Sequence, residues 1–170
     1  MIYPYGGGTI MIADLKRVPN GTIACFERHW KHAAEDVWSF LTENEKLAKW
    51  FSELEVTDLR EGGSIRFNMP DGTFMELNII ELIPGSVLEY TWAEDRVRFE
   101  LYPEPNGCRL LLIETIHHIT SHTPKDLAGW HVCLNVIEAL LDGSTLESRE
   151  AEWKIWYGKY QKHVDHFLKI

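Results

Sequence analysis

Cysteine pairs and long hydrophobic runs are scarce in this sequence, and each absence argues against a class of protein. The three cysteines, Cys25, Cys108 and Cys133, are an odd number and show no C-x-x-C spacing. They suggest buried thiols rather than a disulfide framework or a zinc site. The uncharged stretch Thr9 to Ala13 is too short to span a bilayer. Residues 1–8 have neither the basic nor the apolar region of a signal peptide, so we expect a cytoplasmic protein without membrane insertion.

Positive charge is also in short supply. Lys and Arg number 17 against 26 Asp and Glu, which gives a formal net charge of −9, and no basic run occurs. Such a surface repels phosphate backbones and anionic lipid, so we expect no nucleic-acid partner. The sequence contains no G-x-S-x-G motif and no phosphate loop. Gly6-Gly7-Gly8 precedes no strand-turn-helix unit and is interpreted as a flexible end.

The composition is that of an ordinary globular domain with an aromatic-rich interior. Apolar residues make up 45%, aromatic residues 12% and charged residues 25% of the chain. At about 150 residues per domain, 170 residues predict one domain. A domain of this size removes about 70% of its extended-chain surface from water, so its stability requires no metal or cofactor, and we expect none.

The middle of the chain has the pattern of an antiparallel meander. Apolar and polar residues alternate around Ile65, around Tyr90 and around Phe99, and this period of two predicts strands with one solvated face. Turn signals separate these segments at intervals of about ten residues. They are Glu61-Gly62-Gly63, Pro70-Asp71-Gly72, Pro84-Gly85-Ser86, Glu94-Asp95 and Pro105-Asn106-Gly107.

Helical spacing appears on both sides of the meander. After a predicted strand at Thr22 to Lys31, the segment Ala33 to Phe51 predicts a pair of short helices, with Asn44 as a cap for the second. The segment Pro124 to Leu141 predicts a long amphipathic helix, and Glu150 to Leu168 a further one. An antiparallel sheet has one apolar face to cover, and the long helix is available to cover it. The sequence therefore predicts an α+β domain in which the sheet grips this helix.

Particular residues resemble a known superfamily. Three groups of segments carry the resemblance: the first helix and the turn after it, the central strands, and the last helix of the match. They are Ala34-Glu35-Asp36-Val37-Trp38, Leu41-Thr42, Lys49-Trp50-Phe51 and Glu61 to Phe67; Glu81-Leu82-Ile83-Pro84, Leu88 to Trp92 and Gly107 to Leu112; and Gly129-Trp130 with Leu134. Together they resemble the START-like (SRPBCC) superfamily, in the branch named after the activator of heat-shock protein 90 ATPase. The resemblance departs from the branch pattern at Glu114, where a His is common.

The resemblance implies a helix-grip fold, START-like or Bet v-like, with a curved antiparallel sheet around a long C-terminal helix. It covers a START-like domain at 22–141 and does not account for the rest of the chain, so we also expect an N-terminal extension at 1–21 and a linker with an extra amphipathic helix at 142–170. Families of this superfamily bind lipids, sterols, flavonoid-like or polyketide ligands between sheet and helix. Some members are cyclases or hydrolases, and some activate a chaperone ATPase.

The leading functional hypothesis is binding of a small hydrophobic, aromatic or lipid-like ligand. The alternation places large apolar and aromatic side chains on the face toward the long helix, with the Tyr90 hydroxyl and the Trp92 indole N–H as polar handles. The alternative is a core that these side chains fill completely. Candidate ligand-binding residues are Phe67, Met69, Met75, Leu77, Leu88, Tyr90, Trp92, Phe99, Leu112, Glu114, Trp130, His131 and Leu134.

Glu114 is the only candidate catalytic residue. It follows Leu110 and Leu112 on the inward face, where a carboxylate needs hydrogen bonds or a raised pKa. It could serve a cyclase or hydrolase as acid or base, assisted by Tyr90 or His131, unless a bulge returns it to solvent. No metal site is predicted among the nearby histidines, because adjacent ones point to opposite faces of a strand. These histidines are His117, His118, His122 and His131.

The last predicted helix carries an aromatic stripe that must be covered. The residues on one face of this helix are Trp153, Trp156, Tyr157, Tyr160, Val164 and Phe167. This face packs either on its own domain or on a second copy of the chain, so both a monomer and a homodimer remain open. Activation of a chaperone ATPase is the lowest-ranked alternative, because no docking motif is visible.

Overall fold

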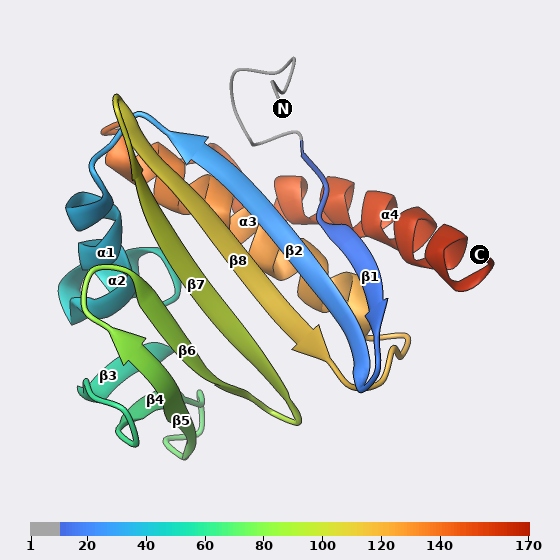
Figure 1. Cartoon of the computed structure of the whole chain (residues 1–170), viewed down its shortest axis with the longest axis horizontal. Coiled ribbons are helices and arrows are strands. Elements are labelled where there is room, and N and C mark those ends of the chain that lie inside the picture. The colour runs from blue at the N-terminus through green and yellow to red at the C-terminus, as the bar shows by residue number, and fades with distance from the viewer. Residues whose placement is uncertain (1–10) are drawn as a thin grey trace.

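The computed structural model describes residues 11–170, which form eight strands and four helices (Figure 1). The predicted flexible end at Gly6-Gly7-Gly8 lies outside these residues. The strands are β1 (Asp14–Val18), β2 (Gly21–Trp30), β3 (Leu54–Asp58), β4 (Ser64–Asn68), β5 (Phe74–Ile83), β6 (Val87–Trp92), β7 (Asp95–Glu104) and β8 (Gly107–Ile116). The helices are α1 (Ala34–Thr42), α2 (Asn44–Trp50), α3 (Thr123–Leu141) and α4 (Arg149–Leu168).

The strands form one sheet in the order β1-β2-β8-β7-β6-β5-β4-β3, and every neighbouring pair is antiparallel. The sheet curves around α3, which crosses one of its faces (Figure 1). Trp130 and Leu134 of α3 are 2% and 1% exposed. The predicted α+β helix-grip fold is therefore confirmed.

The turns of the meander lie where the sequence predicts them. Gly72 joins β4 to β5 with a φ of 88°, and Gly85 joins β5 to β6 with a φ of 78°. Glycine adopts this left-handed region without steric cost, which is why it stands at these reversals. Two strands have no such signal: β1 and β3 are five residues long and mostly polar or half-buried. The sequence indicated neither of them.

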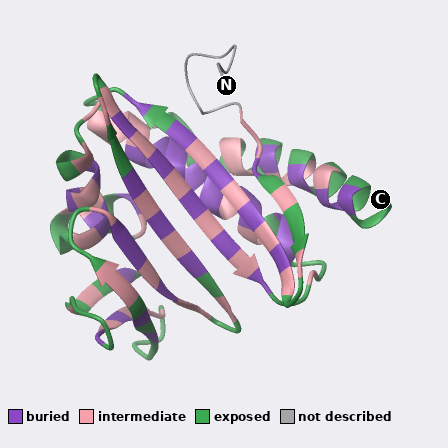
Figure 2. Ribbon diagram, viewed as in Figure 1, coloured by how far each residue is buried: buried purple, intermediate pink, exposed green. Residues whose placement is uncertain are grey.

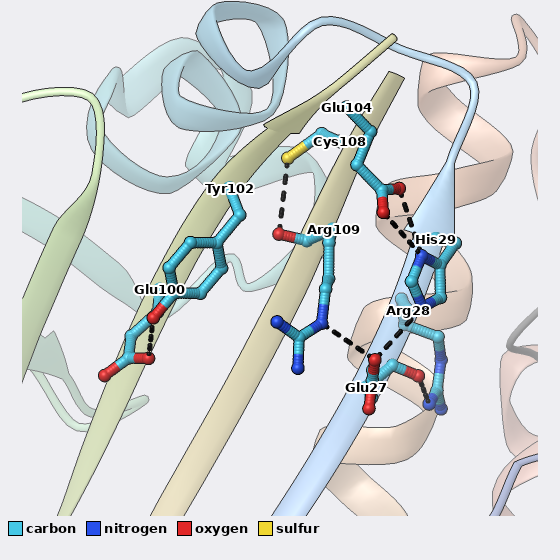
Figure 3. Close-up of polar contacts among 8 residues, drawn as sticks. All are labelled: Glu27, Arg28, His29, Glu100, Tyr102, Glu104, Cys108 and Arg109. Atoms are coloured by element: carbon cyan, nitrogen blue, oxygen red, sulfur yellow. Dashed lines mark hydrogen bonds and ion pairs between the residues drawn. The ribbon is translucent and has the colours of Figure 1, made fainter. Parts of the chain in front are cut away.

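The alternation along the strands separates an inner from an outer face. Buried and less buried residues follow one another along β2, β7 and β8 as bands in Figure 2. On the outer face these strands carry paired charges (Figure 3). Arg109 Nε lies 2.8 Å from Glu27 Oε2, and His29 Nδ1 lies 3.0 Å from Glu104 Oε1. Exposed pairs of this kind contribute about 0–1 kcal/mol each, so the inner face provides most of the stability.

The capping role predicted for Asn44 is wrong. The residue that caps α2 is Glu43, without a side-chain hydrogen bond. The Asn44 side chain instead accepts a hydrogen bond from the Val56 N–H at 2.7 Å and donates one to the Val56 carbonyl at 2.9 Å. A backbone partner in β3 satisfies both functions of the amide. This contact ties α2 to β3 and so positions the segment that joins them.

Helix α4 packs along the side of α3. Its buried residues are Trp156, Tyr160, Val164 and Phe167. The Tyr160 hydroxyl accepts a hydrogen bond from the Ala13 N–H at 3.0 Å and lies 2.7 Å from Nδ1 of His131. Tyr160 therefore connects α4 both to α3 and to the chain just before β1.

Replacing Tyr160 with Phe should destabilise the protein by about 1–3 kcal/mol, because the buried Ala13 N–H loses its acceptor and His131 loses a donor. Tyr157→Phe, on the same helix with only a half-buried side chain, is the matched control and should change stability by less than about 0.5 kcal/mol. Urea unfolding of both variants measures the difference. Equal stabilities would contradict the structural role of this hydroxyl.

Removing residues after Ser148 should abolish most of the thermal stability. Four side chains of α4 are buried, and at about 1.5–3 kcal/mol each their contribution is comparable with the whole stability of a domain. A thermal melt together with the mass in solution checks this. A truncated chain that keeps its melting temperature would contradict the packing, and a halved mass with an intact fold would instead identify α4 as a dimer interface.

Candidate functional site

An aromatic cluster fills much of the space between α3 and the far part of the sheet. The ring centroids of Trp92 and Trp130 are 5.0 Å apart, and Phe51 lies 5.7 Å from Trp92 and 5.9 Å from Trp130. Phe67 lies 5.9 Å from Phe51 and from Trp92. Most of these pairs meet edge to face or tilted, which is the favourable geometry for aromatic rings. The interior here is packed rather than hollow.

Six of the predicted ligand-binding residues belong to this packed core. Each is at most 3% exposed, and none lines the cavity that lies beside the aromatic cluster. They are Leu77, Leu88, Tyr90, Phe99, Leu112 and Leu134. Their position corresponds to the filled-core alternative for the centre of the sheet.

A cavity of about 620 Å³ opens beside the aromatic cluster. Its walls come from the end of α2 and the segment after it, the end of β6, one side of α3 and the first turn of α4. Its lining residues are Trp50, Phe51, Ser52, Glu53, Trp92, Asp126, Gly129, Trp130, Val132, Cys133, Arg149, Glu150 and Trp153. We call this space the aromatic cavity.

Two predicted residues, Trp92 and Trp130, line the aromatic cavity. Phe67 does not line the cavity, but its ring contacts those of Phe51 and Trp92, which do. Met69 is half-buried and Met75 is 43% exposed, and neither lines the cavity. Sequence reasoning did not assign the contributions of Phe51, Asp126 and α4 to a site. The only signal for α4 was its aromatic stripe, which includes Trp153.

His131 lies on another side of α3. Its ring stacks on Trp156 with a centroid distance of 3.5 Å, and the Arg28 guanidinium lies 3.4 Å from its Nδ1. The side chain is fully buried beneath α4 and β2 and does not line the aromatic cavity. The structure gives His131 a place in the contact between helices.

Glu114 points inward, as the alternation predicts. Its neighbours in the sheet, Ala24 and Val97, continue an unbroken register, so no bulge returns it to solvent. The residue is 1% exposed, and no donor group of the described residues reaches either carboxyl oxygen. A buried carboxylate without hydrogen bonds would be strongly destabilising, which points to a protonated group.

The group facing Glu114 is the carboxyl of Asp126 on α3. Two ionised carboxylates would repel each other, so a hydrogen bond between them requires a proton on one of the two. Asp126 Oδ1 also accepts a hydrogen bond from Nε1 of Trp92 at 3.1 Å. Strands β8 and β6 and helix α3 thus each contribute one member of a Glu114–Asp126–Trp92 chain.

Burial raises the pKa of Glu114 well above its usual range, and the neighbouring charge of Asp126 raises it further. Burial also raises the pKa of Asp126, but hydrogen bonds from Glu114 and Trp92 oppose that change. The pKa of Glu114 is raised further than that of Asp126, so Glu114 is the member that holds the proton and donates a hydrogen bond to Asp126. The pKa of Asp126 is still raised overall, but its hydrogen bonds favour the ionised form on the member that lines the aromatic cavity.

A second hollow of about 310 Å³ lies on the other side of Asp126 and includes Asp95, His118 and His122. His117 Nδ1 lies 3.3 Å from Asp95 Oδ1. Within residues 11–170, no three His, Cys, Asp or Glu side chains come together as metal ligands. In the same residues no helix has the length and apolar character needed to cross a membrane.

Solved structures with similar folds extend over nearly the whole chain. A conserved protein of unknown function from Enterococcus faecalis, EF2215, superposes with a TM-score of 0.81 at 23% identity and covers 93% of both chains. CalU16 from Micromonospora echinospora has a TM-score of 0.68 at 18% identity, covering 88% of this chain and 94% of its own. The Bordetella parapertussis protein BPP1335 has a TM-score of 0.69 at 20% identity, with coverage of 92% and 94%. At these identities the likeness shows the fold alone.

No curated protein matches the sequence significantly. The model of one family, described as activator of Hsp90 ATPase homolog 1-like protein, matches residues 31–142. The matched segment contains α1, the sheet from β3 onward and α3. Because it spans more than half of the chain, and because the fold is the one that this family shares with START-like proteins, this chain belongs to the family of activator of Hsp90 ATPase homolog 1-like proteins.

Proposed function

We propose that the protein binds a small hydrophobic ligand, aromatic or lipid-like, in the aromatic cavity. The observation that carries the proposal is the lining of the cavity by the indole rings of Trp92, Trp130 and Trp153. Its volume of about 620 Å³ falls in the range of small-molecule sites, about 300–1,000 Å³. Family membership supports the proposal, because the START-like fold commonly holds hydrophobic ligands.

The location of the cavity specifies what such a ligand would contact. Its rings would stack on indole faces, and each aromatic contact of this kind contributes about 0.5–1.5 kcal/mol beyond the burial of area. The backbone at Gly129 forms one wall, where the absence of a side chain leaves room. The first turn of α4 contributes another wall through Arg149 and Trp153, so the extra helix takes part in the site.

A second candidate function is that of a cyclase or hydrolase acting on such a ligand. The observation that favours it is the largely buried carboxyl pair of Glu114 and Asp126, in which burial raises the pKa of Glu114, since general acid catalysis needs a carboxyl that holds its proton near neutral pH. A proton would pass from Glu114 through Asp126, which reaches the cavity. Activation of a chaperone ATPase, which the description of the family names, ranks third and is tested by adding the protein to purified chaperone and measuring ATP hydrolysis.

Filling the cavity should abolish binding without unfolding the protein. A Cβ at Gly129 meets no atom within 4 Å, so Gly129→Leu places its side chain in the cavity, and the loss of a helical glycine adds about 1 kcal/mol of stability. Titration with flavonoids, fatty acids and polyketide-like compounds, followed by amide shifts near Trp92 and Trp130, should show binding to the natural chain and none to this variant.

Gly158→Leu is the matched control. Gly158 is also a helical glycine whose Cβ would meet no atom within 4 Å, and it lies on α4 outside the cavity lining. This variant should bind as the natural chain does. The absence of amide shifts in the natural chain at millimolar ligand, or equal binding by both variants, would contradict the proposed function.

Glu114→Gln should change how stability depends on pH. The folded state holds a proton on Glu114 that the unfolded chain releases near pH 4.3, so stability falls as pH rises above about that value, by up to about 1.4 kcal/mol per unit, until the folded group ionises. The variant lacks this loss and should gain relative stability with increasing pH. Urea unfolding between about pH 5 and pH 9 measures it. The exposed Glu147→Gln is the control, and parallel curves for Glu114→Gln and the natural chain would refute the assignment of the proton.

A further inference from the structure

The charges around the aromatic cavity are mostly negative. Asp126, Glu53 and Glu150 line it, against Arg149 as the one cationic side chain among its described lining residues. Glu53 and Glu150 are exposed, and Glu150 is paired with Lys154 at 3.2 Å. Asp126 differs from both because it is partly buried on the wall of the cavity. Its charge is screened least by solvent, so it dominates the electrostatics of the cavity.

Asp126 forms no ion pair among the described residues, although the nearby charge of His122 lowers its pKa. The ion pairs of residues 11–170 do not include it. Its hydrogen-bond partners are the indole N–H of Trp92 and the carboxyl of Glu114, both of them uncharged donors. A partly buried carboxylate without a counter-charge is costly, and a ligand that brings a positive charge would remove that cost.

The cation of Arg149 lies toward the other end of the cavity. Its guanidinium donates to Sγ of Cys133 at 3.3 Å. Cys133 follows Asp126 by seven residues on α3, which is two helical turns or about 10 Å. The Arg149 guanidinium therefore acts at the Cys133 end of the cavity, about two helical turns along α3 from Asp126. Glu53 also lies near Cys133 and opposes the charge of Arg149 there.

We propose that the aromatic cavity selects ligands in which an apolar, preferably aromatic, body carries a cationic nitrogen, with the cation placed against Asp126 and the faces of Trp92 and Trp130. This inference rests on the proposed function and specifies its ligand class. Indole faces attract cations, most strongly where water is excluded, and a carboxylate beside two indoles combines that attraction with an ion pair. Glu114 is a positioning residue here, because its buried carboxyl faces Asp126 and, when protonated, donates to the Asp126 carboxylate.

The test compares three probes that share one naphthalene ring: 2-naphthylmethylammonium, 2-naphthylmethanol and 2-naphthoate. Their affinities for the natural chain are measured by calorimetry or amide shifts at neutral pH and low ionic strength. The ammonium probe should bind at least about tenfold more tightly than the alcohol, and the carboxylate more weakly than the alcohol. An equal affinity for all three, or a preference for the carboxylate, would overturn the inference while leaving the proposed function intact. No binding of any probe would refute both.

The variant Asp126→Asn tests whether Asp126 is the residue responsible for the preference for the ammonium probe. The amide oxygen can still accept from Trp92, so the variant removes the charge and keeps that hydrogen bond. The ammonium probe should then bind only as well as the alcohol, whose affinity should stay within about twofold of its value for the natural chain. The exposed Asp165→Asn on α4 is the matched control and should keep the full preference. A preference that survives Asp126→Asn would overturn the assignment, and the ranking of probes on the natural chain decides the inference even if this variant fails to fold.

Discussion

The structure depends on the burial of α3 on more than one side. Adjacent residues of an α-helix point about 100° apart, and on α3 both Trp130 and His131 are buried, the first against the aromatic cluster and the second against α4. A helix that is buried on almost every side must pack its apolar surface against more than one neighbouring element. The sheet packs on one side of α3 and α4 packs on another. The Tyr160 hydroxyl connects α4 to the chain before β1 by accepting the hydrogen bond of the Ala13 N–H. The extra C-terminal helix therefore completes the core.

The same constraint explains where the cavity lies. The sheet and α4 both cover α3, but they leave a gap on the side of Asp126, Gly129 and Cys133, next to the end of β6. These positions are three and four residues apart, which places them along one face of the helix. Gly129 has no side chain to project from that face, and Trp92, Trp130 and Trp153 form the walls on either side. The cavity follows from the incomplete meeting of two layers, whereas the centre of the sheet is closed by large side chains.

The sequence predicts well what local periodicity determines. The strands around Tyr90 and Phe99, the helix that carries Trp130 and the reversals at Gly72 and Gly85 all lie as expected, because a period of two or of 3.6 and a left-handed glycine are local properties. The strands β1 and β3 have no such local signal. They exist because β2 and β4 offer them edges to pair with, and that is a tertiary effect.

The candidate site was harder to predict for a related reason. Alternation showed that Glu114 points inward, but its partner Asp126 is on α3 and the hydrogen-bond donor Trp92 is on β6. Periodicity says which face a residue occupies and nothing about which residue of another element it meets. His131 was placed correctly on the long helix, yet its neighbours turned out to be those of α4 rather than those of the cavity.

The electrostatics of the cavity depend on the inward position of Glu114 on β8 and on its tertiary contact with Asp126 on α3. Burial alone favours the neutral form of either carboxyl, and a neutral pair would leave Glu53, Arg149 and Glu150 as the charged residues of the cavity lining. The pKa of the more deeply buried Glu114 is raised further than that of Asp126, and the indole N–H of Trp92 donates to Asp126, so ionisation of the pair is favoured on the member that reaches the cavity. The proton on Glu114 thus removes the repulsion that two ionised carboxylates would have at this point of the cavity wall. This arrangement adds a largely buried carboxyl pair to a cavity whose other charged lining residues, Glu53, Arg149 and Glu150, are exposed.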